Sequence, residues 1–171
     1  MKKIIGLVIS LTVISGVCAA VLAYVDSITK GPIAEMKVKQ EQAAVKAVLP
    51  DGVEKVESEK DFYVGRTAGK AVGYAAKGTD AGGYGGDVTL MVGFKADKKT
   101  VVCYKVLAAA ETPGLGMKLK TPEFAGQFSG QDGTSLAVKK DGGTIEAITS
   151  ATITSRAVCR AIADAAKKIK N

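Results

Sequence analysis

The chain has 171 residues, and it contains no histidine and no tryptophan. Lys and Arg number 24 against 17 Asp and Glu, which gives a formal net charge of +7. The lack of histidine excludes catalytic triads, imidazole zinc sites and His-ligated haem, because each needs an imidazole as base or ligand. Cys18, Cys103 and Cys159 show no Cys-x-x-Cys spacing. We therefore expect no zinc ribbon, no Cys₄ iron–sulfur cluster and no metal site within this chain.

An uncharged segment runs from Ile4 to Val25, directly after Lys2 and Lys3. As a helix it would be about 33 Å long, enough to cross a bilayer. A secretory signal peptide is the alternative, but the apolar run is longer than a typical signal peptide has. Val17 precedes Cys18 where a lipoprotein signal needs a small residue, which argues against lipidation. The segment favours an uncleaved membrane anchor.

Orientation follows from the two lysines at the start of the chain. The positive-inside rule places the N-terminus in the cytoplasm and the rest of the chain on the outer side of the inner or plasma membrane, although Lys30, Lys37 and Lys39 weaken the contrast. Beyond the anchor, basic residues are dispersed among acidic ones without interleaved aromatics. Nucleic acid is therefore not an expected partner. A membrane-facing surface, an acidic partner or plain solubility are the remaining uses of the charge.

The pattern of elements predicts three parts: the cytoplasmic N-terminus and anchor at 1–25, a stalk helix within 26–50, and one domain at 51–171. Pro32 is placed to begin the stalk helix, and Pro50 to end it. Short runs rich in β-branched residues predict an antiparallel sheet. These runs are Phe62–Val64, Ala71–Ala76, Val88–Phe94 and Val101–Ala108.

The last third of the chain is expected to hold a short helix over Pro122–Phe128, a strand near Leu136–Val138 and a terminal helix. Apolar residues at helical spacing define the terminal helix, and Thr154 or Ser155 is its expected N-cap. The order of helix, strands, short helix, strand and helix predicts an α+β domain.

Two segments have the composition of a binding site. Ile148–Arg156 places five hydroxyls and a guanidinium at the start of the last helix, which favours an anion such as phosphate; an ordinary N-cap is the alternative. Glu111–Gly116 has glycines that allow close backbone approach to a flat ligand; a structural turn is the alternative. The glycine cluster at Gly82–Gly86 lacks the lysine of a phosphate loop and is best explained as a turn, with Tyr84 near a ligand ring.

Several features together give the chain a resemblance to one protein family. They are the order of anchor, glycine turn and terminal helix, and the two motifs Glu111–Gly116 and Thr149–Thr152. The chain resembles the FMN-binding G subunit of Rnf electron-transport complexes, which is related to the C subunit of the sodium-pumping NADH:quinone reductase. The resemblance covers essentially the whole chain. Two departures are Ser150, where the family commonly has glycine, and Glu146, where it usually has aspartate.

The resemblance implies that a flavin transferase joins FMN through its phosphate to the hydroxyl of Thr152, with Thr154 as the alternative acceptor. We expect the loop Glu111–Gly116 to wrap the phosphate and ribityl end of the flavin, with Thr112 donating to the cofactor and Leu115 covering its ring. No catalytic acid or base is implied, because the electron chemistry belongs to the flavin. The remaining cofactor-binding residues implied are Thr149, Ser150, Ala151, Ser155, Glu111, Gly114 and Gly116.

The expected function is that of an electron-relay subunit in an Rnf-type ferredoxin:NAD oxidoreductase coupled to ion translocation. Its expected partners are the other membrane subunits of the complex. A stand-alone exported flavoprotein that serves an extracellular acceptor is the second hypothesis, and a non-redox module for a phosphorylated ligand is the third. Apolar neighbours favour free, buried thiols for Cys103 and Cys159 over a disulfide.

Overall fold

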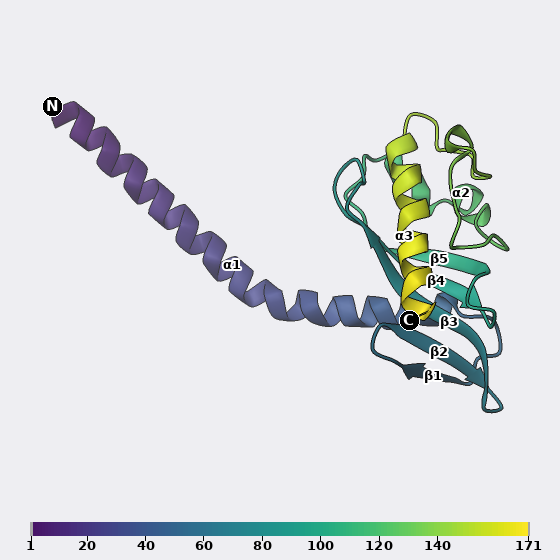
Figure 1. Cartoon of the computed structure of the whole chain (residues 1–171). Helices are drawn as coiled ribbons and strands as arrows, with labels where there is room; N and C mark the ends of the chain where they lie inside the picture. Colours follow the sequence, from purple (N-terminus) through teal and green to yellow (C-terminus); the bar gives the residue numbers. More distant parts are fainter. Residues whose placement is uncertain (1, 171) are drawn as a thin grey trace. The chain divides into compact units, whose positions relative to one another are not determined.

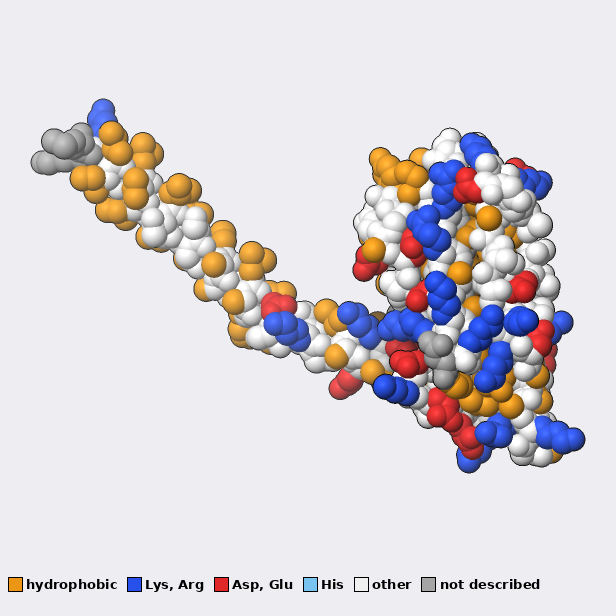
Figure 2. All heavy atoms as spheres, in the orientation of Figure 1, with side chains coloured by type: hydrophobic (Ala, Val, Ile, Leu, Met, Phe, Trp, Pro, Cys, Tyr) orange, Lys and Arg blue, Asp and Glu red, His pale blue; other side chains and the backbone are white. Residues whose placement is uncertain are grey.

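The computed structural model describes residues 2–170, which form two compact units that divide between Gln40 and Glu41. The first unit is the greater part of one long helix, α1 (Lys2–Val48) (Figure 1). Its most apolar stretch has a mean hydropathy of 2.5 and is fully exposed within the structure. Orange apolar side chains cover this stretch on the face seen in Figure 2. By length and composition, α1 is therefore a candidate membrane span.

Pro32 lies inside α1 and does not begin a separate helix as expected. Proline has no N–H to donate, so it removes one intrahelical hydrogen bond, yet the flanking residues keep helical geometry. The helix ends at Val48, two residues before Pro50, as the sequence predicts. Its last turns, from Glu41 on, belong to the second unit.

The second unit is built on a five-stranded antiparallel sheet with the strand order β1-β2-β3-β4-β5. Four strands contain the runs expected from the sequence, which confirms the antiparallel sheet. β1 was not expected, because it is short and carries charged residues. The strands are β1 (Lys55–Ser58), β2 (Phe62–Thr67), β3 (Lys70–Asp80), β4 (Val88–Lys95) and β5 (Val101–Ala108).

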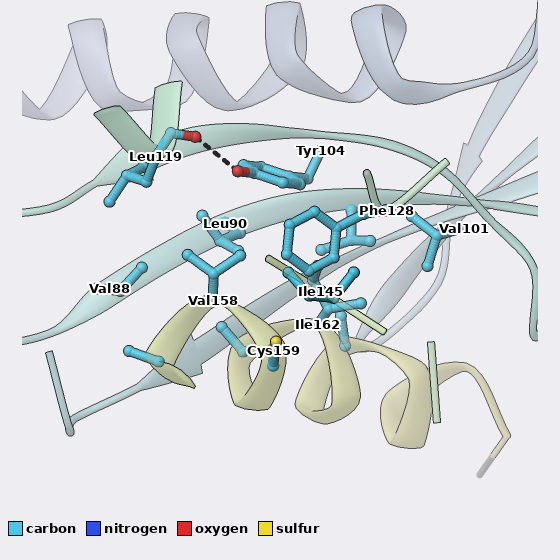
Figure 3. Close-up of a cluster of buried hydrophobic side chains, with 14 of the residues drawn as sticks. Val88, Leu90, Val101, Tyr104, Leu119, Phe128, Ile145, Val158, Cys159 and Ile162 are labelled. Atoms are coloured by element: carbon cyan, nitrogen blue, oxygen red, sulfur yellow. Dashed lines mark hydrogen bonds between the residues drawn. The ribbon is translucent and has the colours of Figure 1, made fainter. Parts of the chain in front are cut away.

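The terminal helix α3 (Thr152–Lys170) covers one face of the sheet. Figure 3 shows Val158 and Ile162 of α3 pointing toward the apolar side chains of β4 and β5. The hydroxyl of Tyr104 in this core donates to the carbonyl oxygen of Leu119 at 2.6 Å. Small residues bring α3 close to the sheet: a Cβ at Gly78 would lie 1.9 Å from the carbonyl oxygen of Ala161. Only glycine fits at this position.

The last turns of α1 cover the opposite face of the sheet. Val45 and Val48 pack there against Ala75 and Met91. A Cβ at Gly93 would lie 1.8 Å from the carbonyl oxygen of Val48, so the helix backbone rests directly on β4. The sheet is thus covered by helices on both faces, which agrees with the expected α+β class.

The two faces also separate the two cysteines of this unit. Cys103 packs on the side of α1, and its thiol donates to the carbonyl oxygen of Ala47 at 3.6 Å. Cys159 is buried on the side of α3. Both are free thiols, and the sheet lies between them.

Short helical elements connect β5 to α3, and they include the expected short helix. The expected strand near Leu136–Val138 is reduced to one isolated bridge between Val138 and Ile145. α3 begins at Thr152, so neither Thr154 nor Ser155 is its N-cap, and the expectation for the cap is wrong. The connecting elements are η1 (Gly116–Lys120), α2 (Pro122–Gly126) and η2 (Lys139–Asp141).

Candidate functional site

Three segments far apart in the sequence surround a cavity of about 520 Å³. They are the turn between β3 and β4, the loop after β5 and the start of α3. The two segments singled out from the sequence, Glu111–Gly116 and Ile148–Arg156, therefore meet at one site. The lining residues are Tyr84, Glu111, Thr112, Leu115, Gly116, Ser150, Ala151, Thr152, Ile153 and Thr154.

Glu111 joins the three segments. Its side chain is buried, with 7% of the residue exposed. One carboxylate oxygen accepts from the backbone N–H of Tyr84 at 2.9 Å, and the other accepts from the hydroxyl of Thr154 at 2.8 Å. The loop after β5 thereby holds both the glycine turn and the first turn of α3.

Glycines allow the backbone to approach this carboxylate. A Cβ at Gly116 would lie 2.5 Å from a carboxylate oxygen of Glu111 and 3.0 Å from the Thr154 hydroxyl, and one at Gly83 would lie 2.8 Å from the other carboxylate oxygen. Gly114 is different: open space surrounds its Cβ position, and its φ of +76° is what favours glycine. Gly116 is thus required by contact and Gly114 by conformation.

The start of α3 forms the polar end of the cavity. Ser150 adopts a φ of +62°, a conformation natural to the glycine that the family commonly has there. Ser155 locks the turn, because its hydroxyl accepts from the N–H of Ile148 at 3.0 Å and donates to the carbonyl oxygen of Ala151 at 2.9 Å. By helix geometry, the N–H groups before Ser155 have no acceptor within the helix. This end of the cavity is suited to an anion.

The two candidate acceptors, Thr152 and Thr154, lie in different surroundings. Thr154 is 1% exposed, and its hydroxyl donates to Glu111. Thr152, the first residue of α3, is partly exposed and lines the cavity. An incoming phosphorus atom can therefore reach Thr152 without breaking a buried hydrogen bond, whereas Thr154 would have to give one up.

Three apolar side chains form the outer rim of the cavity. Tyr84 is 72% exposed, Ile153 48% and Leu115 42%. Exposed apolar side chains gathered at one cavity are suited to the face of a flat aromatic ligand. Ile153 was not expected from the sequence, because an exposed isoleucine at a helix start looks like any other helical residue until the cavity beside it is known.

Three of the residues expected to bind the cofactor do not line the cavity. Gly114 and Ser155 support it through the conformations described above. Thr149 lines a separate cavity of about 210 Å³, together with Glu146. Arg156, expected to pair with a phosphate, instead donates two hydrogen bonds to Asp141, at 2.7 and 2.6 Å. This ion pair lowers the pKa of Asp141.

A second ion pair fixes the glycine turn to α3. Arg160 donates to both carboxylate oxygens of Asp80, at 2.9 and 2.8 Å, and to the carbonyl oxygen of Gly82 at 3.3 Å. The hydrogen bonds from Arg160 to the Asp80 carboxylate are the main cause of a lowered pKa of Asp80. A further hydrogen bond, from the backbone N–H of Gly82, also lowers this pKa. Two contacts therefore hold the turn that contains Tyr84. They are the Arg160 hydrogen bonds at the start of the turn and the hydrogen bond from the Tyr84 N–H to Glu111.

The cavity thus has a hydroxyl-rich helix start for a phosphate and an apolar rim for a ring. These two features suit the phosphate and the flat ring of a flavin mononucleotide. Residues 83–167 match the model of the FMN-binding domain. These bounds include all the lining residues named above. The second unit therefore contains an FMN-binding domain.

Relatives of known class match nearly the whole chain. The G subunit of an ion-translocating oxidoreductase complex from Methanosarcina acetivorans is 33% identical, over 94% of this chain and 92% of its own. Its counterpart in the proton-translocating ferredoxin:NAD(+) oxidoreductase complex of Clostridium ljungdahlii is 34% identical, over 91% of this chain and 84% of its own. The chain belongs to the G-subunit family of Rnf ion-translocating oxidoreductase complexes.

A solved structure agrees with this assignment. The C subunit of the Na(+)-translocating NADH-quinone reductase from Parabacteroides distasonis superposes with a TM-score of 0.53 and 25% sequence identity. The superposition covers 64% of this chain and 60% of that one. The related family named from the sequence therefore shares the fold.

Proposed function

We propose that this protein carries FMN covalently, through a phosphoester to the hydroxyl of Thr152. The observation that carries the proposal is the contrast between the partly exposed Thr152 at the cavity and the buried Thr154, whose hydroxyl is held by Glu111. A phosphoester at Thr152 leaves the charged oxygens beside the N–H groups of the first turn of α3, where the helix dipole stabilises them. A covalent bond also prevents loss of the cofactor outside the cell.

The protein's own residues bind and orient the flavin. Ser150 and Thr152 face the phosphate, and Thr112 lies on the wall beside Glu111. Tyr84, Leu115 and Ile153 cover the ring while leaving part of the rim exposed to a redox partner. The bound flavin supplies the electron-transfer chemistry, so no side chain of the cavity has to act as an acid or a base.

We place this flavin in an electron relay within an Rnf-type ferredoxin:NAD oxidoreductase coupled to ion translocation. The family assignment and the candidate membrane span of α1 support this role. α1 crosses the membrane with Lys2 and Lys3 in the cytoplasm, and the FMN-binding domain lies on the outer side. Other membrane subunits of the complex are the partners, and a flavin transferase attaches the cofactor.

Intact mass tests the attachment. The full chain is coexpressed with a flavin transferase, and the adduct is followed by mass and by fluorescence on a denaturing gel. Thr152→Ala is expected to abolish the adduct, and Thr152→Ser, which keeps a hydroxyl, to restore it. Thr154→Ala, which removes the alternative acceptor, is expected to leave the adduct largely intact.

Two outcomes would contradict the proposal in different ways. An adduct that persists in Thr152→Ala and disappears in Thr154→Ala would move the attachment site to Thr154. An unmodified wild-type chain, from a host that flavinylates a relative in parallel, would refute covalent FMN altogether. A flavinylated chain that purifies from its native membranes without any other membrane subunit would favour the stand-alone carrier.

A further inference from the structure

Glu111 places a buried carboxyl group at the cavity. One of its oxygens accepts from the backbone N–H of Tyr84, which can only donate, and the other is hydrogen-bonded to the hydroxyl of Thr154. Among residues 2–170, no Lys or Arg forms an ion pair with Glu111. The carboxyl group is therefore hydrogen-bonded to neutral groups and is not paired with a cation among these residues.

A charge on a carboxyl group buried in this way would have a cost. Desolvation of a carboxylate is unfavourable, and two neutral hydrogen bonds compensate it only in part. A glutamine of the same shape would tie the same segments together without a charge: its carbonyl oxygen accepts from the Tyr84 N–H, and its amide donates to the Thr154 hydroxyl. Joining the three segments thus explains the shape of the side chain but not its charge.

The position of the charge indicates its effect. Glu111 lines the cavity, and each carboxylate oxygen uses one acceptor site on a protein donor, which leaves lone pairs for the cavity side. Interactions between charges are stronger across a cavity from which water is excluded than across solvent. A ligand in the cavity therefore lies near this carboxylate, which is hydrogen-bonded to Thr154 in the first turn of α3.

We propose that Glu111 carries a negative charge and that this charge lowers the reduction potential of the flavin in this cavity, an inference that rests on the proposed function. Each electron that the flavin accepts from its redox partner without a proton adds one negative charge to the cavity. The fixed carboxylate repels that charge and so favours the oxidised form. Glu111 is a positioning residue through its hydrogen bonds and an electrostatic determinant of the potential through its charge.

The test compares two substitutions that separate charge from hydrogen bonding. Glu111→Gln removes the charge and keeps both hydrogen bonds, whereas Thr154→Val removes one hydrogen bond and keeps the charge. The midpoint potential of the flavinylated full chain is measured by titration with dithionite. Glu111→Gln is expected to be more positive than the wild type by a tenfold change in the ratio of oxidised to reduced flavin, about 59 mV for a one-electron couple. Thr154→Val is expected to shift the potential much less.

Controls distinguish a local charge from general electrostatics. Glu59→Gln neutralises an exposed carboxylate in the turn between β1 and β2, far along the sheet from the cavity, and is expected to match the wild type. The shift in Glu111→Gln is expected to persist near 1 M salt, where exposed charges are screened beyond about 3 Å. In the protein without flavin, hydrogen exchange at the Tyr84 N–H is expected to be equally slow in wild type and Glu111→Gln.

Several results would overturn the proposal. These are an unchanged potential in Glu111→Gln, a shift that disappears in high salt, and an equal shift in Thr154→Val. If Glu111→Gln loses the protection of the Tyr84 N–H, Ile153→Lys and Ile153→Glu provide the test at the rim of the same cavity. The potential should then rise with Lys and fall with Glu, and no movement in either refutes the idea. A wild-type chain without flavin would instead refute the proposed function.

Discussion

At the scale of single residues, the cavity depends on positions where a side chain or a backbone angle admits few substitutes. Gly116 touches the Glu111 carboxylate, Gly114 adopts a positive φ, and Ser150 holds a positive φ without being glycine. A non-glycine residue in this conformation costs about 1–2 kcal/mol. Strain of this size is retained where the surroundings fix the conformation, as the hydrogen bonds of Ser155 do here.

Alanine substitutions at the two glycines should therefore differ in effect. Gly114→Ala places its methyl group in open space, so the only destabilisation comes from the positive φ of an alanine. We expect a loss of about 1 kcal/mol in the free energy of unfolding and normal flavin content. Gly116→Ala pushes against Glu111 and Thr154 and should cost more, about 2 kcal/mol or above, with poor flavinylation. Urea unfolding monitored by circular dichroism, together with fluorescence on a denaturing gel, measures both effects.

Equal effects of the two substitutions on flavinylation would contradict this distinction. In particular, a Gly116→Ala variant with full flavin content would show that the loop moves away from Glu111 at little cost. Loss of the whole fold in Gly114→Ala would show that the segment is a turn required for folding and not a wall of the site.

At the scale of elements, the site is held by pairs of groups that join segments distant in the sequence. Asp80 at the end of β3 and Arg160 on α3 form such a pair beside the glycine turn. The Asp80 side chain is mostly buried in this contact, and the two parallel hydrogen bonds have the geometry that makes arginine–carboxylate pairs stronger than ordinary surface pairs.

The pair predicts a pH dependence. The pKa of Asp80 is lowered in the folded state, so its stabilisation is present above the unfolded pKa of about 3.9 and is lost as the pH falls through the lower folded value. At pH 7, Asp80→Asn should lower the free energy of unfolding by about 1 kcal/mol. The difference from wild type should shrink toward zero below about pH 4. Urea unfolding at a series of pH values measures it, and a difference independent of pH would contradict the assignment.

The sequence predicted the elements whose patterns are local. Four strands and α3 follow from β-branched runs and helical spacing. β1 was missed because it carries charged residues, so no alternation of apolar and polar positions marks it as a half-buried strand. The start of α3 was placed too late because hydroxyl side chains are typical of N-caps, whereas Ser155 here bonds back to Ala151 from within the first turn.

For the site, the sequence predicted which segments take part but not how they contact one another. Arg156 looked like a phosphate ligand because its charge fits, yet Asp141, fifteen residues away, takes both its hydrogen bonds. The contact between Glu111 and Thr154 spans 43 residues. Contacts of this kind depend on how the sheet and α3 pack, and no local pattern records them.

At the scale of the whole molecule, the second unit is a sheet with a separate apolar core on each face. The core beneath α3 contains the aromatic cluster of Tyr104, Phe124 and Phe128 and supports the cavity. The smaller core receives the last turns of α1. The sheet keeps these two environments, and the thiol in each of them, apart.

This separation predicts the behaviour of the cysteines. Cys103 and Cys159 should not form a disulfide under oxidising conditions, since the sheet lies between them. Burial raises the pKa of Cys159 to about 11, which leaves about one thiolate in a thousand at pH 8. Alkylation of the native protein should therefore modify Cys103 well before Cys159. Intact mass after alkylation, with and without denaturant, tests this, and a mass two hydrogens lower after oxidation, reversed by reductant, would contradict it.

The contact between Gly78 and Ala161 makes α3 a lever with its fulcrum at the sheet. Thr152 lies nine residues before Ala161, which is about 14 Å along the helix axis. A tilt of only about 4° at the fulcrum would swing the Thr152 hydroxyl by about 1 Å, a displacement large enough to matter for a reacting atom. The absent side chain at Gly78, about 14 Å from Thr152 along the helix axis, thus sets the position of the residue that we propose to carry the flavin.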